Sequence, residues 1–119
     1  MKRDFYHQTA QWFHLFSHPA RLRILDELRR DDACVCHLQA VLGRPQAYVS
    51  QQLRVLREAG VIESYKDGLF VYYWLADRRV AEVLLNVLGP AGERTVLAGC
   101  PCPRCRGDGD CILTRDQTG

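Results

Sequence analysis

Six cysteines are the residues of this 119-residue chain best suited to chemistry, and they occur in two groups. Cys34 and Cys36 flank a single valine, and the remaining four follow one another near the C-terminus: Cys100, Cys102, Cys105 and Cys111. Thiolates favour soft ions over magnesium, calcium or manganese. Spacings as close as Cys-x-Cys-x-x-Cys are typical of metal ligands. The sequence therefore predicts that these six cysteines bind a soft metal or metalloid ion.

The Cys34-Val35-Cys36 pair lies at the predicted start of a helix over 34–42. Two thiols separated by one residue can converge on one ion, and the positive end of a helix favours their thiolate forms. The alternative is that one of them is a small buried hydrophobic residue. For a lone cysteine we would favour this alternative, whereas the pair leaves ligation open.

The elements that must position this pair follow from hydrophobic periodicity. Apolar residues recur at helical spacing over 4–17, 20–30, 34–42 and 45–58. The turn between the last two of these helices is very short, which is typical of a helix-turn-helix. Strand-forming residues over 61–66 and 69–75 flank Asp67-Gly68, a strong signal for a two-residue hairpin turn. The predicted fold is mainly α with a β-hairpin wing, a winged helix-turn-helix.

The C-terminal part divides into a helix and a tail. The helix predicted over 77–88 has a broad apolar stripe, which favours a two-fold homodimer. Residues 89–119 contain six glycines and three prolines and cannot build a core unaided, although a metal could order them. We expect a DNA-binding and dimerisation domain over 1–88 and a cysteine-rich tail over 89–119.

The predicted helix over 45–58 has one face suited to DNA. Val49, Leu53 and Leu56 should face the core, and no acidic residue occurs between His37 and Arg57. The expected DNA contacts lie on the opposite face and at the hairpin tip: Gln46, Ala47, Ser50, Gln51, Arg54, Arg57 and Lys66. Small and amide side chains suit base edges, whereas Arg54 and Arg57 suit phosphates. Lys66, at the hairpin tip, could reach a neighbouring phosphate or the minor groove.

Three segments together resemble the ArsR/SmtB family of metal-responsive repressors. They are SHPARLRIL at 17–25, VSQQLRVLREAG at 49–60 and DGLFVYY at 67–73. The resemblance implies a homodimeric winged-helix repressor that leaves its operator DNA when an inducer binds. It also implies that the first and last helices of the domain form the dimer interface.

The Cys-Val-Cys pair resembles the inducer site of this family, which binds arsenite or antimonite in some members and cadmium or lead in others. This chain departs from both versions. Gln39 stands where the arsenic type has a third cysteine, and residues 1–33 lack the cysteines of the cadmium type. His7 and His37 are conceivable substitutes. The family's histidine-containing site on the last helix is excluded, because residues 77–119 contain no histidine.

The missing thiolates are therefore expected in the tail, and two arrangements remain open. In one, Cys34 and Cys36 join a tail cysteine of either subunit, in a trigonal sulfur site for As(III) or Sb(III) or a tetrahedral one for Cd, Pb or Zn. In the other, the four tail cysteines hold a separate structural zinc. We favour the first arrangement for at least one tail cysteine.

The sequence thus favours a DNA-binding repressor that is released by a soft ion, with arsenite or antimonite first. The rival hypotheses are a cadmium, lead or zinc sensor and a thiol redox sensor that forms disulfides or persulfides. No catalytic triad or phosphate loop supports an enzyme. The N-terminus lacks a signal-peptide pattern and the longest apolar run is too short to span a bilayer, so we expect a cytoplasmic protein without a membrane partner.

Overall fold

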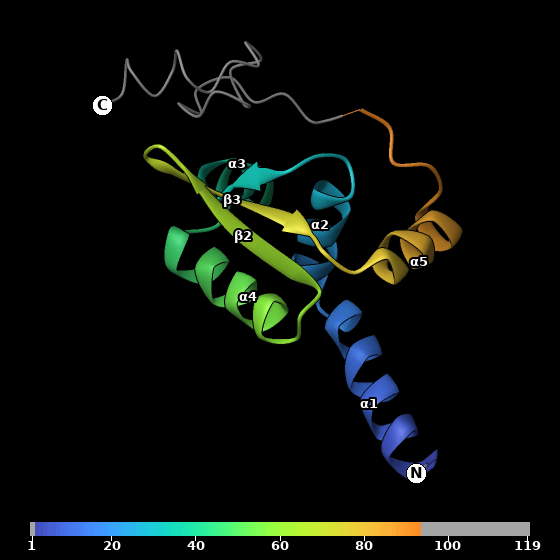
Figure 1. The fold of residues 1–119 in the computed structure, drawn as a ribbon. Helices are drawn as coiled ribbons and strands as arrows, with labels where there is room; N and C mark the ends of the chain where they lie inside the picture. The colour runs from blue at the N-terminus through green and yellow to red at the C-terminus, as the bar shows by residue number, and fades with distance from the viewer. Residues whose placement is uncertain (1, 94–119) are drawn as a thin grey trace.

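The structure is a computed structural model that describes residues 2–93. Its elements follow the chain in this order: α1 (Lys2–His14), the 3-10 turn η1 (Leu15–Ser17), α2 (Pro19–Leu28), β1 (Ala33–Cys34), α3 (Val35–Leu42), α4 (Gln46–Glu58), β2 (Ile62–Asp67), β3 (Phe70–Leu75) and α5 (Arg78–Leu88). Figure 1 shows α3 and α4 on one side of the domain and α5 on the other, with α1 extending away from them. The predicted class, a mainly helical fold with a β-hairpin wing, is confirmed.

One hydrophobic core joins α2, α3, α4 and α5. Ile24, Leu25 and Leu38 are completely buried in it, as are Val49 and Leu56 of α4. Val80 and Leu84 bring α5 into the same cluster. The predicted inner face of α4 is therefore confirmed, and the apolar side of α4 packs against α2 and α3.

The sheet has three strands rather than the two of a simple hairpin. Its order is β1-β3-β2, because Ala33 pairs with Tyr73 and Cys34 with Tyr72. The prediction that Cys34 belongs to the helix is thus corrected: it ends β1 and occupies the N-cap position of α3. A two-residue strand has no periodicity that a sequence pattern could reveal.

The hairpin turn lies one residue later than predicted. Asp67 pairs with Phe70, so the two turn residues are Gly68 and Leu69 rather than Asp67 and Gly68. Gly68 has a φ of +66°, whereas no residue other than glycine has a positive φ in the described part of the chain. Glycine at the first central position is what a type II′ turn requires.

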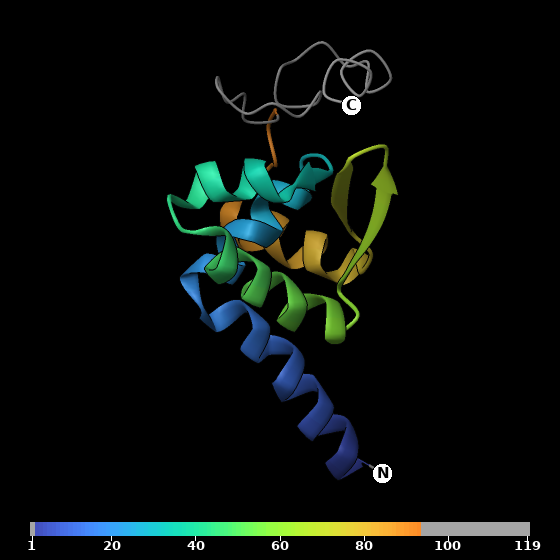
Figure 2. The same ribbon diagram turned by 90° about the vertical axis from the view of Figure 1, so that its left-hand side faces the viewer.

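The helix boundaries also differ slightly from the predictions. The first helix ends at His14, and η1 continues the chain to Ser17. Pro45 is the N-cap of α4 and not its first helical residue. Figure 2, which is turned by 90° from the view of Figure 1, also shows α1 projecting away from the other helices. None of the helices in the described region is long and apolar enough to cross a membrane.

Candidate DNA interface and thiol site

The exposed face of α4 carries the side chains expected to contact DNA. Gln46, Ala47, Ser50, Gln51 and Arg54 are all exposed, while Val49 and Leu53 beneath them are buried. A Nη2 group of Arg54 donates a hydrogen bond of 3.0 Å to Oε1 of Gln51. The helix therefore presents small and amide groups at its N-terminal end and a cation further along, as the predicted base and phosphate contacts need.

The two remaining expected contacts flank this face. Arg57 is exposed in the last turn of α4 and lines a shallow groove with Ser50, Arg54 and Tyr73 of the wing. Lys66 is exposed on β2, where it pairs with Val71 close to the hairpin tip. All seven expected DNA contacts thus lie on the surface of α4 and the wing.

A buried arginine that the sequence analysis missed fixes the position of α4. Arg21 of α2 donates from Nε to the carbonyl of Leu15 (3.1 Å) and from Nη2 to that of His14 (3.2 Å). Its Nη1 donates to Oε1 of Gln52, 3.3 Å away on α4. Gln52 is next to Leu53 on the inner side of α4. This position in the sequence was the only indication that a polar residue of α4 could be buried against Arg21.

The thiol pair lies where β1 meets α3. The Sγ atoms of Cys34 and Cys36 are 2.7 Å apart, Cys34 is 3% exposed and Cys36 is half-buried. A groove of about 300 Å³ opens beside them and is lined by Val35, Gln39, Gln46, Leu69, Phe70 and Val71. The pair therefore faces both the wing tip and the first residue of α4.

An aromatic cluster joins the thiol pair to the wing. Cys34 and the completely buried Tyr72 form a small cluster of their own, against which Cys36 and Phe70 pack. The ring of Tyr65 stacks on that of Tyr72 at a centroid distance of 5.5 Å, and its hydroxyl donates to Asp32 (2.8 Å). Both the backbone pairing and the side chains thus tie residues 32–34 to the hairpin.

The two histidines considered as substitute ligands do not form a group of three potential ligands with the thiol pair in the described region. His37 is 1% exposed, with Nε2 3.1 Å from Oε1 of the buried Glu27. The other carboxylate oxygen of Glu27 accepts from Arg30 at 2.8 Å. His7 is exposed on α1. Within residues 4–93 no group of three or more potential ligands gathers, and Cys100, Cys102, Cys105 and Cys111 lie outside the described residues.

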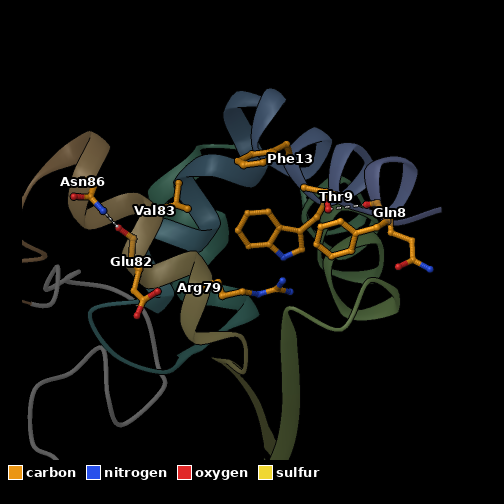
Figure 3. Close-up of a pocket in the computed structure, with 9 residues that line it drawn as sticks. Gln8, Thr9, Phe13, Arg79, Glu82, Val83 and Asn86 are labelled. Carbon is orange, nitrogen blue, oxygen red and sulfur yellow. Dashed lines mark hydrogen bonds between the residues drawn. The ribbon is translucent and has the colours of Figure 1, made fainter. Parts of the chain in front are cut away.

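A second, larger groove of about 540 Å³ lies between α1 and α5. Figure 3 shows the side chains on its two walls: Gln8, Thr9 and Phe13 from α1, and Arg79, Glu82, Val83 and Asn86 from α5. Large apolar side chains are exposed on the same two helices, including Phe5 (66%), Phe13 (54%) and Val87 (71%). These helices form an apolar surface that the rest of the described region leaves uncovered.

Known proteins are similar to this chain in sequence and fold. The family model for the arsR family of bacterial regulatory proteins matches residues 18–64. A transcriptional repressor SmtB homolog of Synechocystis is 37% identical over 73% of this chain and 66% of its own length. A cadmium resistance transcriptional regulatory protein, CadC of Listeria innocua, is 31% identical over 76% of this chain and 75% of its own.

Solved structures agree with these relatives. Rv0081 of Mycobacterium tuberculosis superposes with a TM-score of 0.66 at 38% identity, covering 71% of this chain and 85% of that one. The homodimeric winged helix-turn-helix domain of Mb0332 from Mycobacterium bovis gives 0.66 at 26% identity, covering 73% and 81%. On this agreement of sequence and fold, the chain belongs to the ArsR/SmtB family of transcriptional regulators.

Proposed function

We propose that this protein is a dimeric repressor that leaves its operator when a soft ion binds to its cysteine thiolates. The observation that carries the proposal is the pair of adjacent sulfur atoms, Cys34 Sγ and Cys36 Sγ, 2.7 Å apart beside the wing and α4. Thiolates select soft ions, and this pair is the natural starting point of such a site. We expect the repressor to act in the cytoplasm.

As(III) or Sb(III) is the inducer that the donor set favours. A trigonal sulfur site needs only one thiolate beyond Cys34 and Cys36, whereas tetrahedral Cd, Pb or Zn needs two more. The tail, which we propose as a unit separate from the domain over 1–88, would supply them from Cys100, Cys102, Cys105 or Cys111. A structural zinc held by these four cysteines alone is the competing arrangement.

The dimer is proposed from the apolar surface of α1 and α5. An exposed Val87 or Phe13 costs free energy in water, and burying such side chains against a second copy recovers it. The homodimeric domain of Mb0332 supports this assembly. Two copies related by a two-fold axis would place two α4 helices in successive major grooves, about one helical turn apart.

The contacts of Cys34 suggest how ion binding at the cysteines affects DNA binding. Cys34 pairs with Tyr72 in β3, while Cys36 belongs to the first turn of α3. An ion that joins both sulfur atoms would therefore link a residue paired with a wing strand to the first turn of the helix that precedes α4. We propose that this link changes the placement of the reading helices, with a coupling free energy of roughly 1–3 kcal/mol, the range usual for allostery.

The test is a titration of the reduced full-length protein with arsenite, antimonite, cadmium, lead and zinc. Thiolate–metal absorption reports binding, and fluorescence anisotropy with a labelled operator duplex reports release. The proposal predicts that one or more soft ions bind stoichiometrically and lower operator affinity about 5- to 150-fold. Release that requires an oxidant and ignores every ion would instead establish a thiol redox sensor.

A further inference from the structure

A groove of about 460 Å³ lies beside the α3–α4 turn. It is lined by residues from the start of α2, the end of α3 and the start of α4: His18, Pro19, Ala20, Arg23, Val41, Leu42, Arg44 and Tyr48. Two of these side chains are cationic and none is acidic. The groove is therefore a basic surface next to the DNA-reading helix.

Arg44 is held in a defined position within this groove. Its guanidinium carbon lies 3.8 Å from the ring centroid of Tyr48, a cation–π contact. No ion pair in the described region involves Arg44, whereas Arg23 lies 3.4 Å from Glu27. A stacked guanidinium keeps its N–H groups at the ring edge, where they can donate to an oxyanion.

A helix end at the groove also favours an anion. The groove includes the N-terminal end of α2, where the helix dipole is positive. His18 also lines the groove, and its Nδ1 atom has no hydrogen-bond partner within the described residues. The ring of His18 also lies beside that of Tyr48, with centroids 6.4 Å apart.

The position of Arg44 relative to α4 identifies the anion. Arg44 precedes Gln46, the first residue of α4, by two positions, so it lies at the end of the helix that enters a major groove. The walls of a major groove are the phosphate backbones. We propose that Arg44, positioned by Tyr48, binds a backbone phosphate of the operator. This inference rests on the proposed DNA-binding function.

A phosphate contact of this kind has a measurable signature in the salt dependence of binding. Each neutralised phosphate contributes about 0.9 to the slope of log K against log salt, and a dimer carries two copies of Arg44. Arg44→Ala should therefore reduce the slope by about 2. It should also weaken binding equally for a duplex selected from a random-sequence library and for a mixed-sequence duplex of the same length.

Three control variants isolate the contact. Tyr48→Leu keeps the charge, so it should leave the slope unchanged but weaken binding severalfold. Arg78→Ala removes an exposed cation on α5, away from α4 in Figure 1, and should change neither quantity. Gln51→Ala should instead reduce the ratio of selected to mixed-sequence affinity. Circular dichroism should show that each variant is folded.

The outcomes separate this proposal from the function on which it rests. If the native protein binds the selected duplex and Arg44→Ala retains the native slope, the phosphate contact is wrong and the repressor stands. If Arg44→Ala lowers affinity only for the selected duplex, Arg44 contacts a base and the proposal is again wrong. A native protein without salt-dependent DNA binding would overturn the proposed function itself.

Discussion

Asp77 connects helices α1 and α5 through its carboxylate. Its carboxylate caps α5 by accepting from the backbone N–H of Arg79 (3.0 Å), and it accepts from Nε1 of Trp12 on α1 (3.0 Å). It also pairs with the guanidinium of Arg79 at 2.8 Å. Hydrogen bonds from Arg79 first, and then from Trp12, lower the pKa of Asp77 to about 2 despite partial burial. One carboxylate thus connects the two helices of the proposed dimer surface.

We predict that Asp77→Ala lowers the free energy of unfolding by about 1 kcal/mol at pH 7, the usual cost of losing an N-cap. The loss should be larger than for Asp77→Asn, because asparagine keeps a cap oxygen. Urea denaturation followed by circular dichroism measures both. An Asp77→Ala variant as stable as the native protein would show that the cap contributes nothing.

The charge of Asp77 should also make stability depend on pH. Its pKa is lowered on folding, so the stabilisation is fully present above its ordinary value of 3.8 and disappears as the pH falls through about 2. The difference in unfolding free energy between the native protein and Asp77→Asn should therefore shrink between pH 4 and pH 2. A difference that stays constant over that range would contradict this assignment.

At the scale of the elements, β1 joins the wing to the thiol pair, because Cys34 in β1 pairs with Tyr72 in β3. The helices and the hairpin could be predicted because each has a periodic apolar pattern several residues long. Strand β1 could not, because Ala33 and Cys34 become a strand only through pairing with β3. The hairpin turn shifted by one residue because Asp-Gly also fits a type I′ turn, and cross-strand pairing decides between the two registers.

Sequence patterns could predict which face of α4 is exposed but not the tertiary contacts around the thiol pair. The exposed face of α4 follows from the spacing of Val49, Leu53 and Leu56, and all three are buried. The contacts among Cys34, Tyr65 and Tyr72 join segments distant in sequence, and no local pattern reports them. The buried pairing of His37 with Glu27 has the same origin. Tertiary contacts, rather than local propensity, determine these parts of the site.

The wing connection leads to a prediction about Tyr65→Phe. This change removes the hydroxyl that donates to Asp32 but keeps the ring stacked on Tyr72. We expect ion affinity to remain within about twofold of native, because no ligand is lost. The ion-induced loss of operator affinity should fall severalfold, since the connection between residues 32–34 and β2 is weakened.

Ion titrations and operator titrations with and without the ion give the two quantities for this variant. Tyr6→Phe is the matched control, because it removes a tyrosine hydroxyl from α1, where the side chain is 67% exposed. A Tyr65→Phe variant with the native ratio of operator affinities would mean that the wing does not transmit ion binding.

At the scale of the whole molecule, the proposed repressor requires two copies of the chain. Val87 is 71% exposed on α5, so a charged residue there should be tolerated by the monomer but not within an apolar interface. We predict that Val87→Glu is folded, sediments as a monomer and binds the operator at least tenfold more weakly. Val87→Ala is the control and should remain dimeric. A dimeric Val87→Glu protein would place the interface elsewhere.

The measurement that tests the central claim most directly is operator release by soft ions in Cys34→Ser and Cys102→Ser, compared with the native protein. Each variant should bind the operator with native affinity when no ion is present. We predict that Cys34→Ser loses at least tenfold in sensitivity to arsenite, and that Cys102→Ser responds more weakly if the tail completes the site. Native release by Cys34→Ser would contradict the assignment of the inducer site to the thiol pair.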